Sequence, residues 1–401
     1  MKHILYCADG TWNGPGDPGA QDDIDATSSA TGEGAARTTN VWKLFVDLAG
    51  AVTPETASMP SEQEKLYSGA GGLPLQVAKY MHGVGDSSNL AIKALGGVFG
   101  AGVIARIVRG HTFISRNYQP GDAIHVVGFS RGAYTARALA GMICSVGLLN
   151  PKKYDSADKF QAYVLGYGAW LKARGVVFGG GGTVSRWLTG LVHGAELLAS
   201  RLLFSRGDFI TGIPIQSVAV WDTVGSMGIP LYIQDKRRDA FSFVDTKLNP
   251  NVLHGFHAIA FDERRRDFPV TRWIARKDVE EVWFSGCHSD VGGGYPAGET
   301  GLSDLALDWM MARLQSQGVT FAANLPLKPD LTHYAQDFHK PWETPPFDID
   351  PQPRSPAATD VFDPTVRKRW EECTPYRACW PAGSIVAQVM QYPGPPRTMN
   401  A

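Results

Sequence analysis

The chemistry that this sequence could perform begins with Ser130, which lies in the pattern G-x-S-x-G. A short apolar run (123–127) precedes it and a stretch of good helix formers without proline (133–146) follows. This pattern predicts a buried strand, a sharp turn and a helix. In such a turn the serine hydroxyl is exposed at the edge of a sheet, and glycines such as Gly128 and Gly132 let the two arms pass close together. We interpret Ser130 as a nucleophile, with a structural glycine-rich turn as the alternative.

Two residues further along the chain could complete an acid–base set in the order Ser…Asp…His, which is that of α/β-hydrolases. Asp222 follows a segment (215–221) that we predict to be a buried strand, and His288 follows another predicted strand (281–285). Ligands of parallel sheets bind beyond the carboxyl ends of the strands, so we expect these side chains to meet there. Ser130 would attack an acyl carbon, His288 would carry its proton to the leaving group, and Asp222 would hold the imidazole tautomer.

Other residues of the same types compete for these roles. His257, with His254 behind it, is the main rival to His288, but both lie in a segment (252–261) that we predict to be helical. A histidine that follows a strand fits the Ser…Asp…His template better than one inside a helix. Asp222 could instead cap a helix or anchor a loop, but its place after a strand beyond the serine favours the catalytic interpretation.

The oxyanion of such a reaction needs backbone donors. The N–H of Arg131, directly after the serine, is one candidate, and we expect a second from another loop, at Gly10 or Thr11. Asp9 and Asp290 could orient loops or bind a metal ion. No compact ligand set such as H-E-x-x-H occurs, so we interpret both as loop-supporting residues and expect neither a metal nor a cofactor.

The order of the predicted elements indicates the fold. The sequence predicts strands at 3–8, 65–67, 123–127, 215–221 and 281–285, and helices at 41–49, 89–118, 133–146, 252–261 and 303–317. Their alternation indicates an α/β-hydrolase-like fold, with a doubly wound, mainly parallel sheet, helices on both faces and a helical, lid-like insertion. We assign the catalytic domain to 1–325, and expect the proline-rich residues 326–401 to wrap the surface of the same domain.

The segment 151–212 separates the serine from the strand that precedes Asp222. Within it, residues 184–204 place apolar side chains on one helical face, after a run of glycines (179–182) that predicts a hinge. One interpretation is a helix packed on the core. The other is a lid, or a helix that makes peripheral contact with a membrane. The sequence leaves both open.

The overall composition limits the classes of partner. The chain has 401 residues, 44% of them hydrophobic and 19% charged, with a net charge of -1, so nucleic acid is not an expected partner. Its five cysteines include no C-x-x-C pair and are expected to stay reduced. The N-terminus does not resemble a signal peptide, and no apolar run reaches the roughly 18–20 residues of a membrane span. We expect synthesis in the cytoplasm, with export by a route without a cleaved signal left open.

Five motifs occur in order along residues 1–320. They are DGTWN (9–13), GFSRGAYTARALAG (128–141), VWDTVGS (220–226), HAIAFDERR (257–265) and HSDVGGGY (288–295). Together they resemble a family of bacterial and fungal α/β-hydrolases that was long labelled uncharacterised and that includes phospholipase effectors of type VI secretion. The resemblance implies the triad Ser130, Asp222 and His288, and it places His257 in a helical structural motif.

The same resemblance implies hydrolysis of phospholipids, typically at the sn-1 chain, toxicity to competing cells, and a partner in the secretion apparatus or an immunity protein. We therefore expect a serine-dependent carboxylic ester hydrolase, phospholipase A-like, that forms an acyl-enzyme with a phospholipid or another acyl ester. Larger effectors of the family carry an additional membrane-anchoring module, for which 401 residues leave little room. This keeps a soluble small-molecule esterase or amidase open as an alternative, and a non-catalytic binding module on the same fold is the other.

Overall fold

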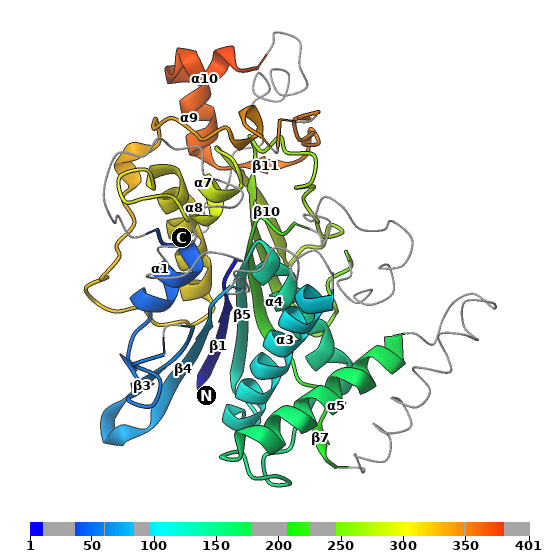
Figure 1. Ribbon diagram of the computed structural model, residues 1–401. Coiled ribbons are helices and arrows are strands. Elements are labelled where there is room, and N and C mark those ends of the chain that lie inside the picture. The colour runs from blue at the N-terminus through cyan, green and yellow to red at the C-terminus, as the bar shows by residue number, and fades with distance from the viewer. Residues whose placement is uncertain are drawn as a thin grey trace, which may run out of the picture.

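A computed structural model of the protein describes residues 1–10, 37–59, 61–83, 97–177, 207–224, 246–345, 347–348 and 350–380. Within these residues one sheet has its strands in the order β11-β10-β9-β8-β5-β1-β4-β3-β2, as Figure 1 shows. Its strands are β1 (His3–Ala8), β2 (Ala51–Val52), β3 (Glu62–Ser68), β4 (Pro74–Met81), β5 (Ala123–Phe129), β8 (Ile215–Trp221), β9 (Val252–Ala260), β10 (Val279–Phe284) and β11 (Val361–Phe362). A separate antiparallel pair joins β6 (Leu148–Leu149) to β7 (Phe209–Ile210).

The sheet is mainly parallel. Every neighbouring pair from β4 through β1, β5, β8, β9 and β10 to β11 runs parallel. Only the edge formed by β2, β3 and β4 is antiparallel. Strands are added on both sides of β1, because β4 lies on one side and β5 on the other. This arrangement confirms the predicted α/β class with a doubly wound, mainly parallel sheet.

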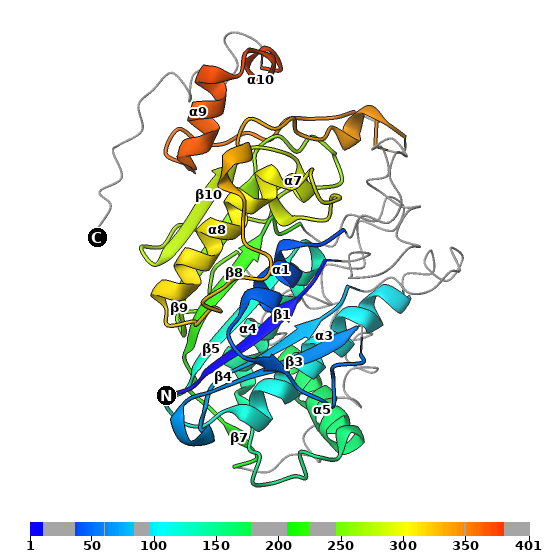
Figure 2. The same ribbon diagram turned by 90° about the vertical axis from the view of Figure 1, so that its left-hand side faces the viewer.

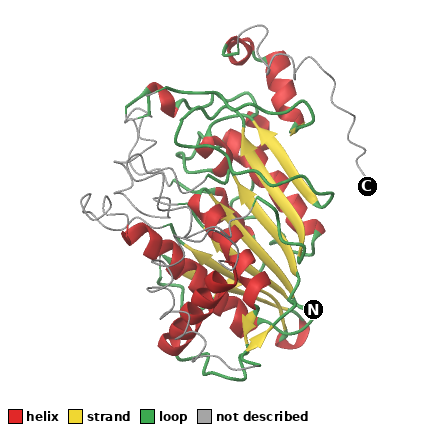
Figure 3. Cartoon of the chain, turned by 90° about the vertical axis from the view of Figure 1, so that its right-hand side faces the viewer, coloured by secondary structure: helices red, strands yellow, loops and turns green. Residues whose placement is uncertain are grey.

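Helices cover both faces of the sheet, as Figures 1, 2 and 3 show from three sides. One face carries α3 (Gly97–Asn117), α4 (Arg131–Val146) and α5 (Lys159–Val177), and the other carries α1 (Asn40–Asp47) and α8 (Gly301–Ser316). Shorter helices are η2 (Ala70–Gly72), α7 (His288–Gly292), η3 (Leu331–His333), η4 (Pro341–Glu343), α9 (Pro364–Glu372) and α10 (Thr374–Ala378). Among the described helices, none combines the length and the apolar character that crossing a bilayer requires.

The central strands are mainly apolar because both of their faces are covered. In β1, Ile4 and Tyr6 belong to the core beneath α3, α4 and α5, while Leu5 and Cys7 belong to the core beneath α1 and α8. All four side chains are fully buried. Successive residues of a strand point to opposite faces, so a strand between two helical layers reads as a continuous apolar run.

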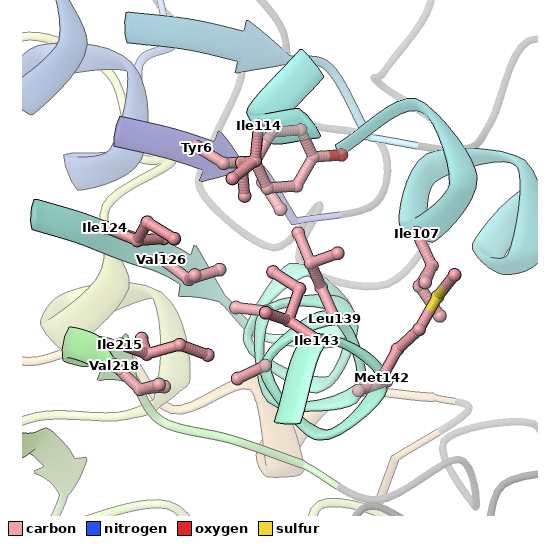
Figure 4. Packing of buried hydrophobic residues seen from close by; sticks show 14 of the residues in the cluster. Tyr6, Ile107, Ile114, Ile124, Val126, Leu139, Met142, Ile143, Ile215 and Val218 are labelled. Atoms are coloured by element: carbon pink, nitrogen blue, oxygen red, sulfur yellow. The ribbon is translucent and has the colours of Figure 1, made fainter. Parts of the chain in front are cut away.

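Figure 4 shows how the first of these cores holds α4 in place. Val126 on β5 and Val218 on β8 face Leu139 and Ile143 of α4, and Ile107 of α3 closes the cluster from the far side. The strand before Ser130 and the helix after it are therefore both fixed by the same buried side chains. The turn between them has little freedom to relax.

The helix predicted for 252–261, and with it the helical motif around His257, is wrong. These residues form β9, which lies between β8 and β10 and runs parallel to both. Side chains on both faces of this strand are buried, with Phe256 and Ala258 on one side and Ile259 on the other. A short run that is apolar on both faces resembles a buried helix in sequence, so periodicity alone does not separate the two.

The strand β4 is one that the sequence pattern did not predict. Its Gln76 and Lys79 are buried although they are polar. Lys79 forms ion pairs with Glu62 and Glu64 of the neighbouring strand β3, and these pairs hide the charge from the core. A buried lysine is tolerated when it is paired and hydrogen-bonded. Because β4 contains such polar residues, its hydrophobicity pattern did not predict a strand.

The described residues after 325 pack against one edge of the sheet. The strand β11 pairs with β10, and Val366 and Trp380 join Ile259, Phe261 and Trp283 in one buried cluster. The described parts of the insertion (151–177 and 207–212) contain α5, whose Gly166 packs closely on α3, and β7. The amphipathic helix predicted at 184–204 lies outside the described residues.

Candidate active site

Ser130 lies at the sharp turn from β5 into α4, with a backbone φ of 56°. Three non-glycine residues in the described parts of the chain have a positive φ, and Ser130 and Asp222 are two of them. A Cβ on Gly128 would overlap the backbone of Gly132, and a Cβ on Gly132 would lie 2.5 Å from the carbonyl oxygen of Asp9. The crossing therefore requires glycine at both positions, and the strain in the turn is concentrated at the serine.

His288 begins α7, directly after the loop that follows β10. Its Nδ1 lies 2.6 Å from Oδ2 of Asp222, which follows β8. The imidazole is packed between the rings of Phe129 and Phe268, at centroid distances of 4.6 and 5.1 Å. Its Nε2 is buried and has no hydrogen-bond partner in the described parts of the protein, Ser130 included. The carboxylate thus holds the proton on Nδ1, and Nε2 remains as the acceptor.

Asp222 is fully buried and accepts hydrogen bonds from several groups. The N–H of Ala260 donates to Oδ1 at 3.0 Å, and the guanidinium of Arg354 donates to Oδ1 at 2.5 Å and to Oδ2 at 3.1 Å. Burial alone would raise the pKa of Asp222, but the Arg354 charge and the His288 hydrogen bond together bring it well below its usual value. The carboxylate is therefore ionised whenever the protein is folded near neutral pH.

Arg354 is a part of the site that sequence reasoning missed. It lies 132 positions after Asp222, in the proline-rich segment. Besides the carboxylate, it donates to the carbonyl oxygens of Ala260 and Phe268, both at 2.7 Å. A single arginine thus joins the ends of two strands to the loop behind them. No motif surrounds Arg354 in the sequence, so only the long-range fold reveals this contact.

Replacing Arg354 by methionine is expected to lower the free energy of unfolding by about 3 kcal/mol at neutral pH, because it leaves a buried carboxylate without its main counter-charge. Asp222 has a folded pKa below its unfolded value, so its contribution is present above the unfolded pKa and is lost as the pH falls. The difference in the free energy of unfolding between wild type and Arg354→Met should therefore become smaller below about pH 4. Urea unfolding at several pH values measures it.

Arg276 offers a matched control for this prediction. It also donates to backbone carbonyls, those of Asn249, Val252 and Leu253, but no described carboxylate accepts from its guanidinium. The variant Arg276→Met should be less stable than wild type, and this difference in the free energy of unfolding should stay the same at low pH. A loss for Arg354→Met that stays constant down to acidic pH would contradict the electrostatic role of Arg354.

The predicted backbone donors for an oxyanion are only partly described. Arg131 is the first residue of α4, where a backbone N–H has no acceptor within the helix. The N–H of Gly10 donates to the carboxylate of Asp9 at 2.6 Å, so it is engaged in this structure. Thr11 lies outside the described residues. Of the candidates, the N–H of Arg131 is the one whose position at the helix N-terminus favours negative charge.

Asp9 follows β1 and is fully buried. Its Oδ2 accepts hydrogen bonds from Tyr80 Oη at 2.6 Å and from Thr39 Oγ1 at 2.8 Å. Burial raises the pKa of Asp9 to about 7, against these hydrogen bonds, which lower it. Thr39 is also the N-cap of α1. Asp9 therefore ties the end of β1 to β4 and to the start of a helix.

Asp290 caps the short helix that carries His288. Its Oδ2 accepts from the N–H of Cys287 at 2.9 Å and from the N–H of His339 at 2.9 Å. The imidazole of His339 also contacts it, with Nδ1 2.7 Å from Oδ1, and reaches Glu299 Oε2 with Nε2 at 2.9 Å. This network fixes α7 to the segment after residue 325. Among the described residues no cluster of ligands could hold a metal ion.

The raised pKa of His339 predicts that the stability of the protein depends on pH. Burial lowers its pKa, but Asp290 and Glu299 overcome this and raise the pKa above its ordinary value. A group with a raised folded pKa stabilises the protein fully below its unfolded pKa and loses that contribution as the pH rises. The stability difference between wild type and His339→Gln should therefore be larger at about pH 5.5 than at about pH 9, as measured by chemical denaturation.

The exposed His333 provides the comparison, because 63% of its side chain is in solvent where it pairs with Asp330. The variant His333→Gln should show little pH-dependent change in stability, since exposed pairs contribute little. An equal pH-dependent change in stability for His339→Gln and His333→Gln would argue against a stabilising role of the buried network around His339.

His257, the rival of His288, has both ring nitrogens occupied. Its Nε2 accepts a hydrogen bond from the N–H of Thr223 at 3.1 Å, and its Nδ1 lies 3.0 Å from Oε1 of Glu281. Thr223 directly follows Asp222, so His257 supports the loop that carries the aspartate. This leaves His288 as the histidine with an available nitrogen beside the serine turn.

Glu263, a second residue that sequence reasoning missed, holds the backbone of His288. Its Oε2 accepts from the N–H of His288 at 3.0 Å and pairs with Arg265 at 2.9 Å, and both of these charged side chains are fully buried. Burial would raise the pKa of Glu263, but Arg265 lowers it overall. The DERR motif that contains both residues was visible in the sequence, but it did not indicate which of its charges would face the histidine.

Three comparisons with known proteins bear on this site. A family model described as "T6SS, Phospholipase effector Tle1-like, catalytic domain" matches residues 2–313. An uncharacterized protein from Saccharomyces cerevisiae is 31% identical over 163 residues, which are 40% of this chain and 20% of that protein. The chain therefore spans only a small part of this curated relative.

Two solved structures are similar to this chain at low sequence identity. One is described as an uncharacterized protein from Pseudomonas aeruginosa, with 16% identity, a TM-score of 0.41, and coverage of 99% of this chain and 60% of that one. The other is described as the Tle1 effector bound to the VgrG spike from the type 6 secretion system. Its identity is 19% and its TM-score 0.36, with coverage of 74% of this chain and 51% of that one.

Proposed function

This chain belongs to the family of Tle1-like catalytic domains of T6SS phospholipase effectors, and from that premise we propose that it is a serine-dependent carboxylic ester hydrolase of phospholipase A type. The family supports a lipolytic activity. The catalytic residues in the proposal are Ser130 as nucleophile, His288 as general base and acid, and Asp222 as the group that orients the imidazole.

In the proposed reaction, Ser130 Oγ attacks the carbonyl carbon of an acyl ester and its proton passes to His288 Nε2. The oxyanion of the tetrahedral intermediate accepts a hydrogen bond from the N–H of Arg131. Collapse breaks the ester bond, and the departing alkoxide takes the proton from His288. A water molecule, deprotonated by the same nitrogen, then attacks the acyl-enzyme, and the fatty acid leaves as Ser130 recovers its proton.

The observation that carries the proposal is the hydrogen bond between Asp222 and His288 at the carboxyl edge of the sheet, beside the strained turn of Ser130. The carboxylate occupies Nδ1, and Nε2 is buried without a partner in the described parts of the chain. Catalytic hydrogen bonds are often longer before substrate binds, so the absence of a contact from Ser130 to Nε2 is compatible with this assignment.

The proposal includes partners. The substrate is a phospholipid or a related acyl ester, and residues 184–204 are proposed to make peripheral contact with the membrane that holds it. Because the matching family model is described as that of a T6SS phospholipase effector, we also propose a partner in the secretion apparatus or an immunity protein. No cofactor enters any step of the proposed reaction.

A comparison of substrates tests this function. The protein is expected to release fatty acid and lysophospholipid from phospholipid vesicles, and to do so faster than it hydrolyses a soluble short-chain nitrophenyl ester. Treatment with a fluorophosphonate should label Ser130, as detected by peptide mass spectrometry, and should stop both reactions. Hydrolysis of the soluble ester alone would instead identify a small-molecule esterase. Absence of both turnover and labelling would identify a non-catalytic module.

A further inference from the structure

A cavity of about 210 Å³ lies between the carboxyl end of β4 and the first half of α3, two elements that lie beside each other in Figure 2. Arg106, Arg109, His82 and Ser61 are among the residues that line it, and none of the described lining residues is acidic. Pockets for drug-sized ligands usually measure roughly 300–1,000 Å³, so this cavity suits a small polar group. The charge of its lining favours an anion.

Arg106 is the central residue of this cavity. Its side chain is buried, with 6% of the residue exposed, and within the described chain its guanidinium makes one hydrogen bond, a long one of 3.4 Å to the carbonyl oxygen of Asp9. A guanidinium carries five N–H donors. A buried cation whose donors are mostly unused is costly, and the usual remedy is an anion that accepts from several of them.

The neighbouring carboxylates are already committed to other groups. Asp9 directs its oxygens to Tyr80, Thr39 and its neighbouring backbone N–H. Glu62 pairs with Arg109 at 2.9 Å and also with Lys79. Arg106 is therefore a buried cation whose donors point at no carboxylate among the described residues. Burial also lowers the pKa of Arg106, which an anion in the cavity would oppose.

The cavity is close to the turn that carries Ser130. The carbonyl oxygen of Asp9 accepts from Arg106 on one side, and on the other it lies so near Gly132 that a Cβ there would be 2.5 Å away. The carbonyl group of Asp9 thus lies next to both the Arg106 guanidinium and the backbone two positions after the nucleophile. A ligand that fills the cavity and also reaches Ser130 must carry an anionic group a few bonds from its reacting carbon.

We propose that this cavity binds the phosphodiester group of a glycerophospholipid while its acyl ester lies at Ser130. Arg106 is the main ligand of the phosphate, and Arg109 is the second. In such a lipid only the glycerol backbone separates the phosphate from the acyl esters, and guanidinium groups bind phosphate oxygens through paired N–H donors. The inference rests on the proposed function and specifies why a phospholipid is preferred to a neutral ester.

The test compares two substrates in one set of variants. The measured quantity is the ratio of kcat/KM for a phospholipid to kcat/KM for a neutral diacylglycerol, both presented in the same detergent micelles. Arg106→Gln should lower this ratio on the order of ten- to a hundredfold, because hydrogen bonds to charged groups are the strong ones. Arg106→Lys should retain part of the preference, and Arg109→Gln should lose less than Arg106→Gln.

Arg116 provides the matched control on the same helix. It pairs with Glu64 and is not among the residues that line the cavity. Arg116→Gln removes the same charge from α3 and should leave the substrate ratio as in wild type. An Arg106→Gln variant that loses both activities equally would overturn the proposal, since Arg106 would then act through Asp9 on the serine turn. An unchanged ratio would overturn it as well.

A second measurement does not depend on phospholipid turnover. Glycerol 3-phosphate and inorganic phosphate should each inhibit hydrolysis of the soluble nitrophenyl ester and raise the melting temperature of wild type, but not of Arg106→Gln. If phosphate binds in this way while phospholipid is not hydrolysed, the anion site stands and the phospholipase function fails. If phospholipid is hydrolysed while neither phosphate compound depends on Arg106, the function stands and the anion site fails.

Discussion

Replacing Ser130 by alanine is expected to lower ester hydrolysis on the order of 10⁴-fold or more. The proposed acyl-enzyme cannot form without Oγ, and what remains is the contribution of substrate binding and backbone donors. The residue keeps its Cβ, so the turn with its φ of 56° is not relieved of strain and the fold should persist. Initial rates with a soluble ester, together with circular dichroism, check both parts of this expectation.

Ser145 is a suitable control for the same substitution. It lies near the end of α4, where its Oγ donates to the carbonyl oxygen of Met142 at 3.1 Å. Ser145→Ala should keep the activity of wild type. Activity of Ser130→Ala close to that of wild type would show that Ser130 is not the nucleophile. The structural interpretation of the glycine-rich turn would then be favoured.

The variant Asp222→Asn is expected to lower kcat on the order of 10⁴-fold. An amide can donate to Nδ1 of His288, which stabilises the tautomer with the proton on Nε2, where the base is needed. The effect on KM should be small, because the role proposed for the carboxylate is to orient the imidazole for proton transfer rather than to bind substrate. Asp122→Asn, which removes a carboxylate paired with Lys2 at the opposite end of β5, should cost stability but little activity.

The same variant allows the link with Arg354 to be measured. Asp222→Asn leaves the buried guanidinium without its counter-charge, so the free energy of unfolding should fall by about 3 kcal/mol. Adding Arg354→Met removes that unpaired cation, and the double variant should recover part of the stability while its activity stays low. If the losses of stability were simply additive, the ion pair would not be the reason for the contact between the two segments.

The strands around the site could be predicted because burial on both faces leaves a clear signal. β1 and β8 have the predicted bounds, and the predicted runs at 123–127 and 281–285 overlap β5 and β10. These strands are mainly apolar and end close to a glycine or an aspartate, so the positions of Ser130, Asp222 and His288 after strands followed directly. Their mutual geometry did not follow from sequence, because it depends on sheet order.

Other elements depend on contacts between distant residues, which local patterns do not contain. β9 was predicted as a helix because its apolar residues cover both faces over a short run. The strand β4 was not predicted because its Lys79 is buried against Glu62 and Glu64, which come from another strand. The role of Arg354 depends on a pairing across 132 residues, and no local property of a proline-rich segment distinguishes this arginine from a solvent-exposed one.

The pairing of Arg354 with Asp222 has a consequence for the order in which the protein is made. Polypeptides leave the ribosome from the N-terminus, so the serine, the aspartate and the histidine are all synthesised before the arginine that neutralises the buried aspartate. A fragment that ends at residue 313, where the family match ends, contains the first three without the fourth. Full assembly of the charged centre therefore waits until residue 354 has been synthesised, and the centre stays incomplete in every nascent chain shorter than that.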